Sequence, residues 1–112
     1  MKRLLPLLLL FSCAEAGPPP LPPEAETLVP VMTDLQLVEA IMPEVPVMVR
    51  DSMRDVFNER TLADHGLDQE RFDSLLWIVR AEPVWIDTLY SRVGDELARR
   101  IAERTRKRNR PD

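Results

Sequence analysis

The chain has 112 residues, of which 45% are hydrophobic and 30% are charged, with one cysteine and one histidine. This length allows a single small domain. One cysteine excludes an intramolecular disulfide framework and a zinc site built from several thiolates, and one histidine excludes a multi-histidine metal cluster. Because the usual catalytic side chains are scarce, we expect no enzymatic activity and no cofactor.

The charge is distributed unevenly along the chain. Residues 14–96 contain six basic and seventeen acidic residues, whereas residues 97–112 contain seven basic and two acidic residues. Nucleic-acid binding needs a positive surface that displaces counterions from phosphates, so the acidic body argues against it. The basic end either contacts an anionic surface, such as lipid headgroups or an acidic protein patch, or complements a helix dipole and extends into solvent. The residues concerned are Arg104, Arg106, Lys107, Arg108 and Arg110.

The N-terminal residues are typical of a secretory signal. Lys2 and Arg3 precede an apolar run over residues 4–11 that is too short to cross a hydrocarbon core of about 30 Å. Residues 10–13, Leu-Phe-Ser-Cys, resemble the lipobox of bacterial lipoproteins. A cysteine thiolate can form a thioether with a diacylglyceryl group, and the small Ser12 gives a peptidase access to the preceding bond. We therefore predict a signal peptide over residues 1–12 and a membrane anchor through acyl chains on Cys13; the alternative is an ordinary cleaved signal with a chance cysteine.

Residues 13–26 are predicted to form the lipidated end and a proline-rich tether. Five of the six residues from 18 to 23 are proline, which enforces a polyproline II conformation of roughly 19 Å. Such a segment holds a domain away from a membrane. The alternative is a proline-rich ligand for an aromatic groove of another protein.

A helical domain is predicted over residues 27–106, followed by a basic tail over residues 107–112. Thr27 is the expected N-cap of the first helix, and Pro43 and Pro46 should end that helix and force an extended connection. Gly66 should close the second helix. The apolar face of the first helix comprises Leu28, Val31, Met32, Leu35, Val38 and Met42, and that of the second comprises Val49, Met53, Val56 and Phe57.

The third helix has the clearest start in the sequence. Leu67, Asp68 and Phe72 have the spacing of an N-cap closed by a hydrophobic staple, and Pro83 suits the first turn of a fourth helix. The third apolar face comprises Phe72, Leu75, Leu76 and Val79, and the fourth comprises Ile86, Leu89, Tyr90, Val93, Leu97 and Ile101. Because the sequence lacks an alternating strand pattern, we predict an all-α fold, a small bundle of three to four helices.

Two stretches resemble the domain of unknown function 4296 family. They are residues 65–75, His-Gly-Leu-Asp-Gln-Glu-Arg-Phe-Asp-Ser-Leu, followed by Pro83, Ile86, Tyr90 and Val93, and residues 32–40, Met-Thr-Asp-Leu-Gln-Leu-Val-Glu-Ala. The similarity covers about residues 27–100. It implies a small helical lipoprotein of the kind found in Bacteroidota, without an established activity. The chain differs from the family at Asp68, where Thr is more frequent, and at Gln36, where His is common.

Three groups of side chains are candidates for function. Trp77 points away from the apolar face of its helix and, with Ile78 and Trp85, forms a possible partner surface, unless the third helix is buried on both sides. Asp34, Glu39 and Glu44 are better interpreted as solvated carboxylates than as a catalytic or metal cluster, because a spacing of five does not bring two carboxylates together on a helix. His65 is interpreted as a helix-end residue.

These observations favour a non-catalytic, lipid-anchored cell-envelope protein that docks onto another envelope component. The residues after Cys13 lack an aspartate at the second position, which by analogy with enteric sorting favours the outer membrane. The alternative is a carrier of small molecules or lipids with a cavity between helices, bordered by Met32, Met42 and Met53. A carboxylate-dependent hydrolase ranks last.

Overall fold

The computed structural model describes residues 20–111, so the predicted signal peptide and Cys13 lie outside the described residues. Four α-helices follow one another: α1 (Leu28–Ile41), α2 (Arg50–Asp64), α3 (Gln69–Arg80) and α4 (Pro83–Arg108). A 3-10 turn, η2 (Pro23–Ala25), precedes α1, and two more, η3 (Met42–Glu44) and η4 (Val47–Val49), connect α1 to α2. Residues 20–111 contain no strand, and the predicted all-α fold is confirmed.

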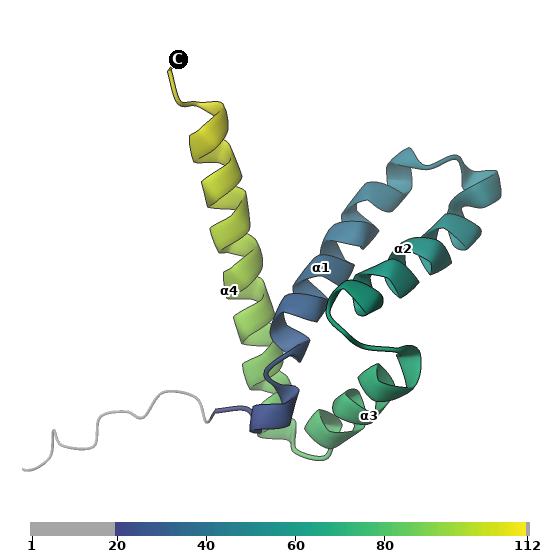
Figure 1. Ribbon diagram of the computed structural model, residues 1–112. Coiled ribbons are helices and arrows are strands. Elements are labelled where there is room, and N and C mark those ends of the chain that lie inside the picture. Colours follow the sequence, from purple (N-terminus) through teal and green to yellow (C-terminus); the bar gives the residue numbers. More distant parts are fainter. Residues whose placement is uncertain (1–19, 112) are drawn as a thin grey trace, which may run out of the picture.

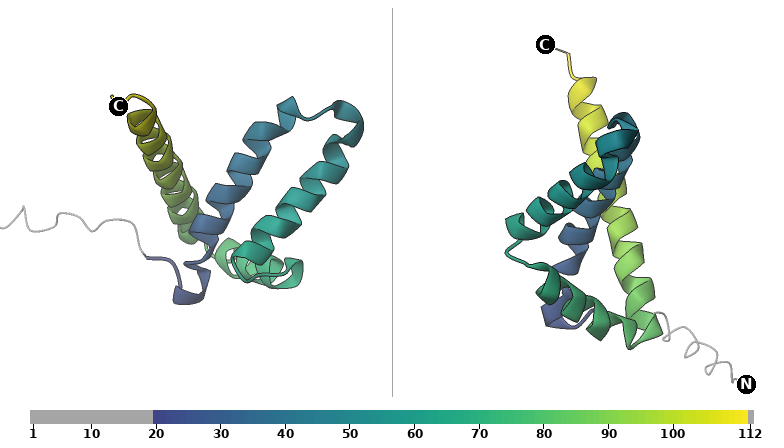
Figure 2. Two further views of the ribbon diagram at one scale, coloured as in Figure 1. Left: turned by 45° about the horizontal axis from the view of Figure 1, so that its top comes forward. Right: turned by 90° about the vertical axis from the view of Figure 1, so that its right-hand side faces the viewer.

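The helices are arranged as a V (Figure 1). One arm is the hairpin of α1 and α2, the other is α4, and α3 lies across the base where the arms meet (Figure 2, left). α1 contacts α2 on one side and α4 on the other. The described chain begins near the base and ends at the far end of α4, so the open end of the V is formed by the hairpin tip and the C-terminal half of α4.

The hydrophobic core lies at the base of the V. It brings together one buried set from residues 21–25, α1, α3 and α4: Leu21, Ala25, Leu28, Val29, Leu75, Val79, Leu89 and Val93. Leu21 and Ala25 belong to the segment predicted as a tether, yet both are buried because η2 turns the chain under α3. Folded structure therefore starts before residue 27, and it continues past residue 106, because α4 includes Lys107 and Arg108.

The junction between α2 and α3 has the predicted chemistry. Gly66 adopts a φ of +74°, and the amides of Gly66 and Leu67 donate to the carbonyls of Ala63 and Leu62, which closes α2. The Asp68 Oδ1 atom accepts a hydrogen bond of 2.7 Å from the Arg71 amide at the start of α3. Leu67 and Phe72 both pack against the core, as a hydrophobic staple does.

The two ends of α1 differ from the prediction. Thr27 occupies the N-cap position, but its side chain makes no capping hydrogen bond, because the helical conformation already begins in the preceding turn. After α1, only Val45 and Pro46 are extended, and the remaining connection is coiled into η3 and η4. Proline is compatible with the first positions of such turns, which is why Pro43 lies inside η3.

Several residues predicted to be buried are exposed. Val49 and Val56 of the second face, and Tyr90 and Ile101 of the fourth, are each about half exposed or more. Conversely, Val29 and Thr33 are buried, although they lie outside the predicted face of α1. α1 has neighbours on several sides, whereas the arms diverge toward the open end, so periodicity alone does not fix burial. No helix among residues 20–111 has the length and apolar character needed to cross a membrane.

Candidate functional site

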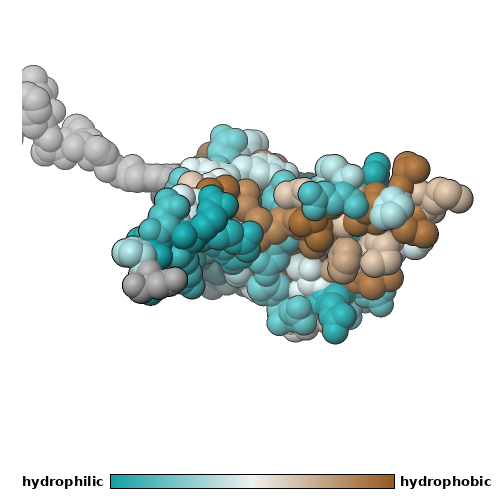
Figure 3. Space-filling view, turned by 90° about the horizontal axis from the view of Figure 1, so that it is seen from above, coloured by the Kyte–Doolittle hydropathy of each residue, from teal (hydrophilic) through white to brown (hydrophobic). Residues whose placement is uncertain are grey.

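The tip of the hairpin arm exposes a group of apolar side chains, the apolar tip: Ile41, Val47, Met48 and Val49. Met48 is 92% exposed and Val47 is 71% exposed, which is unusual for hydrophobic residues in a folded region. The loop carrying them is ordered by Arg50, whose guanidinium donates to the Val45 carbonyl at 2.8 Å. Figure 3 looks onto the open end and shows hydrophobic side chains gathered over the hairpin arm, beside a hydrophilic α4.

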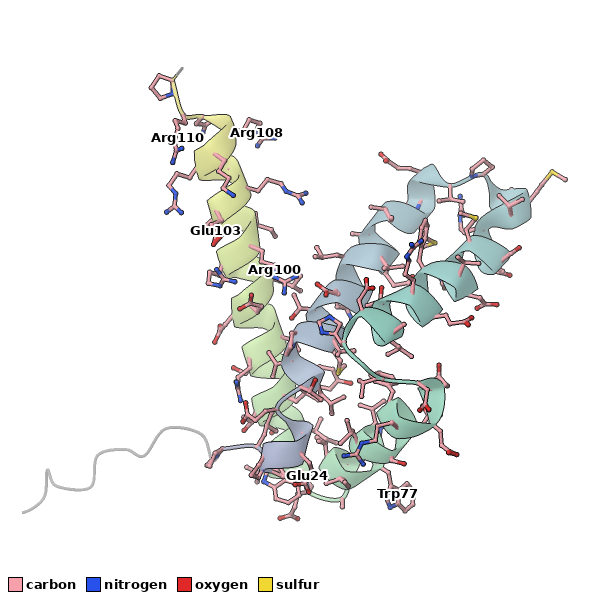
Figure 4. All side chains as sticks on the ribbon, viewed as in Figure 1. Glu24, Trp77, Arg100, Glu103, Arg108 and Arg110 are labelled. Carbon is pink, nitrogen blue, oxygen red and sulfur yellow. The ribbon has the colours of Figure 1, made fainter. Side chains whose placement is uncertain are left out.

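The other arm ends in five cations, the basic end: Arg104, Arg106, Lys107, Arg108 and Arg110. None of them forms an ion pair with a residue between 20 and 111, whereas Arg99 is paired with Glu96 and Glu103. Arg108 and Arg110 lie at the far end of α4 (Figure 4). The positive end of the chain is therefore free of intramolecular partners in the described part of the molecule.

A polar cluster joins the two arms deeper in the V. Asp34 of α1 lies between Arg100 of α4, whose Nη1 is 2.5 Å from Oδ1, and His65, whose Nε2 is 2.7 Å from Oδ2. A carboxylate only accepts hydrogen bonds, so the His65 Nε2 atom carries the proton of that bond. Arg100 points from α4 toward α1 in Figure 4. Three helices are thus tied together through one aspartate, which we name the Asp34 lock.

The carboxylates of this cluster are kept ionised by neighbouring cations and hydrogen-bond donors. Burial opposes the charged form of Asp34, but hydrogen bonds from Arg100 and His65 outweigh it, so the pKa of Asp34 lies below its ordinary value. Hydrogen bonds from Arg99 and Arg100 lower the pKa of Glu96 to about 2. A carboxylate with a lowered pKa is a poor general base. The arrangement therefore suits structural cross-linking better than acid–base catalysis.

A cleft opens beside the Asp34 lock, on the side of the hairpin that faces α4. Its volume is about 440 Å³, within the range of ligand-binding clefts. The lining residues are Asp34, Leu37, Val38, Ala40 and Ile41 from α1, Thr61 and Asp64 from α2, and Arg104 from α4. The cleft reaches both the apolar tip, through Ile41, and the basic end, through Arg104.

Two other hollows lie on the surface of α2. The larger, about 500 Å³, lies between α2 and the start of α3 and has Asp55, Glu59 and Asp68 among its lining residues. The smaller, about 330 Å³, is lined by Val56, Glu59, Arg60 and Ala63. None of these three spaces is lined by Met32, Met42 or Met53, the side chains expected to border a carrier cavity.

The three candidate carboxylates have different surroundings. Asp34 belongs to the lock, Glu39 is paired with Arg54 at 2.8 Å, and Glu44 is exposed in η3. Between residues 20 and 111, no three His, Cys, Asp or Glu side chains are grouped closely enough to hold a metal ion. His65 lies at the end of α2 as its C-cap, in agreement with the helix-end interpretation, and its ring is in addition engaged by Asp34.

The aromatic candidates fall into two kinds. Trp77 is 78% exposed and points away from the base of the V (Figure 4). Ile78 and Trp85 are partly buried and pack against the core, where α3 meets α4. Of the three residues proposed as a partner surface, only Trp77 is fully available to a partner.

Sequence reasoning missed the Asp34 lock and the cleft beside it. Asp34 is separated from His65 by 31 residues and from Arg100 by 66, so no local spacing connects them. It also predicted that Val49 belongs to the apolar face of the second helix, whereas this residue is part of the exposed apolar tip. A signal for the tip was present in the sequence, since residues 45–49 are apolar and adjoin two prolines between helices.

Comparison of the chain with protein-family models, with curated proteins and with solved structures finds no match. The resemblance to the domain of unknown function 4296 family therefore depends on the residues quoted above and stays a prediction.

Proposed function

We propose that this chain is a non-catalytic, lipid-anchored cell-envelope protein that docks onto another envelope component through the open end of its V. The observation that carries the proposal is the apolar tip, which lies on the same end of the molecule as the unpaired basic end. Exposed apolar groups and uncompensated charges each favour a partner that covers them. The cleft between the arms adds a concave surface to the same end.

The anchoring part of the proposal depends on the sequence. The lipobox-like residues 10–13 and the resemblance to a lipoprotein family both support acylation of Cys13. The lack of an aspartate directly after Cys13 supports, by analogy with enteric sorting, a location at the outer membrane. The described chain enters at the base of the V. An anchor upstream of Pro20 would therefore attach to the end opposite the apolar tip, which leaves that tip free to meet a partner.

Two measurements on the full chain expressed in a native host test this proposal. Mass spectrometry of the N-terminal peptide should show Cys13 as the first residue with two or three acyl chains. A photo-crosslinking residue at Met48 should give a discrete adduct in intact membranes, whereas the same residue at Arg71, exposed on α3, should give much less. An unmodified Cys13 would refute the anchor, and equal or absent crosslinking at the two sites would refute docking through the open end.

A further inference from the structure

The two walls of the cleft differ in chemistry. On α1, the wall consists of Leu37, Val38, Ala40 and Ile41, which are hydrophobic and incompletely covered. On α4, the cleft meets Arg104, and Lys107 and Arg108 follow one turn further along the same helix. These three cations have no ion pair among residues 20–111. The apolar wall of α1 therefore faces Arg104 and the basic turn beyond it on α4, while Asp34, which is paired with Arg100, and Asp64 of α2 complete the lining.

We propose that this cleft binds one amphipathic α-helix of a protein partner, with its apolar face on α1 and an acidic face toward α4. The proposal deepens the docking function stated above and depends on it. Side chains spaced three and four residues apart share a helix face, so one stripe of leucines and one flank of glutamates match the two walls. Charge complementarity and burial of the apolar wall then favour the same orientation of the bound helix.

The dimensions of the cleft limit how much of the partner enters it. The stretch from Asp34 to Ile41 covers about 10 Å at 1.5 Å per residue, or roughly two helical turns. An α-helix with its side chains is about 10 Å wide, so two turns of it need more space than the 440 Å³ of the cleft. The bound helix therefore lies across the mouth of the cleft and inserts only its apolar side chains. Asp64 lines the α2 side, so the acidic flank must face away from α2.

A protein helix fits these walls better than an anionic membrane does. A flat membrane surface would meet only the ends of the two arms and would leave Leu37 and Val38, deeper along α1, in water. In addition, the acidic residues Glu44 and Asp51 are exposed beside the apolar tip and would repel anionic headgroups. These carboxylates are compatible with a helix that contacts the tip through apolar side chains.

The test is a binding titration of the full chain, kept in a nonionic detergent, against three fluorescent peptides of about 18 residues, long enough to form a helix. One peptide has a leucine stripe with glutamates on one flank, one has lysines in place of the glutamates, and one has the acidic composition in scrambled order. We expect the acidic amphipathic peptide to bind at least about tenfold more tightly than the other two. Raising salt from about 0.05 M to about 0.5 M should weaken this binding severalfold.

Variants assign the binding to the cleft. The double change R104E/K107E, on the basic wall, should weaken binding by about tenfold or more, and so should Ile41→Glu on the apolar wall. Matched controls are R71E/R80E, two exposed arginines of α3, and Val84→Glu, which replaces a side chain 46% exposed against 47% for Ile41. Both controls should stay within about twofold of the original chain. Circular dichroism verifies the fold, and R104Q/K107Q replaces the charge reversal if that variant is less helical.

The outcomes separate this inference from the proposed function. Preference for the lysine peptide, equal binding of the scrambled peptide, or unchanged affinity in R104E/K107E would overturn the acidic-helix proposal. Binding to phosphatidylglycerol vesicles without peptide binding, lost in R104E/K107E, would overturn it in favour of a lipid contact. A dimer in analytical ultracentrifugation that Ile41→Glu dissociates would overturn it in favour of a second copy of the chain. In each case, selective crosslinking of Met48 to a different protein in native membranes would still support docking through the open end.

Discussion

Removing the guanidinium of the Asp34 lock should destabilise the domain by a moderate amount. The variant Arg100→Met keeps much of the aliphatic length but leaves Asp34 with His65 alone. Two charges about 4 Å apart attract by about 1 kcal/mol in water and about 4 kcal/mol at an effective dielectric constant of 20. Asp34 and Arg100 are 33% and 31% exposed, between these limits, and desolvation offsets part of the attraction. We expect a loss of about 1–2 kcal/mol in the free energy of unfolding.

Urea denaturation followed by circular dichroism measures this effect in a double-mutant cycle with Asp34→Asn. The two single changes should couple by about 1 kcal/mol, since both break the same contact. The matched control is Arg99→Met, which removes a 58% exposed guanidinium from surface pairs and should cost clearly less than Arg100→Met. Zero coupling, or an equal cost for the two arginine variants, would refute the claim that the lock joins the arms.

The same contact determines how the stability of the domain depends on pH in acid. The pKa of Asp34 is lower in the folded chain than its ordinary value of 3.8, so its ionised form stabilises the domain above that pH. This contribution is lost as the pH falls through the folded value, because the unfolded chain takes up a proton more readily. The stability difference between the original chain and Asp34→Asn should therefore narrow as the pH is lowered below about 4. A difference that stays constant in acid would show that the charge of Asp34 does not stabilise the fold.

Further predictions concern local structure and can be measured by the same urea denaturation. Gly66→Ala should lower the free energy of unfolding by about 1 kcal/mol, because a φ of +74° strains a residue with a Cβ; the added Cβ meets no neighbour, so no clash adds to this cost. Gly94→Ala lies within α4 and should raise the free energy of unfolding by about 0.5–1 kcal/mol, because alanine favours a helix. Asp68→Ala removes the only side-chain cap observed among the described helices and should cost about 1 kcal/mol. Leu28→Ala in the core should cost about 2–5 kcal/mol, whereas Ile101→Ala, 61% exposed, should change stability by less than about 0.5 kcal/mol.

Several features that depend on a few consecutive residues were predictable from the sequence, although the cap at Thr27 and the extended connection after α1 were not. Residues that begin or end a helix act locally, and the structure has three of them where the pattern predicts: Gly66, Asp68 and Pro83. The apolar faces predict burial well at the base, where Leu75 and Leu89 meet several helices. They predict it poorly at Ile101, because a periodic pattern shows which face is apolar and not whether another helix reaches it.

Features that depend on distant residues were not predictable. Asp34 was interpreted as a solvated carboxylate and His65 as a helix end, since nothing near either one in the sequence marks the other. Arg100 belongs to a run of arginines in which nothing near it in the sequence marks a partner on α1, yet it is paired with Asp34 of α1 while Arg104 is not. Arg100 lies nearer the base of the V, where α1 and α4 are close enough for the contact with Asp34, and Arg104 lies further out, where the two helices diverge.

The chemistry of the two walls explains why the arms diverge. Closing the V would press Arg104, which has no ion pair among residues 20–111, against the apolar wall of Leu37 and Val38 and would desolvate its guanidinium. Hydrophobic burial on α1 does not outweigh such a penalty when the charges remain unpaired. At Arg100 the cation does have a partner, because Asp34 of α1 supplies a carboxylate, and the two arms can be in contact there. Further along α4, Arg104 has no ion pair among residues 20–111, although Asp64 of α2 lines the same cleft, so a partner that brings acid to α4 and apolar surface to α1 would complement both walls.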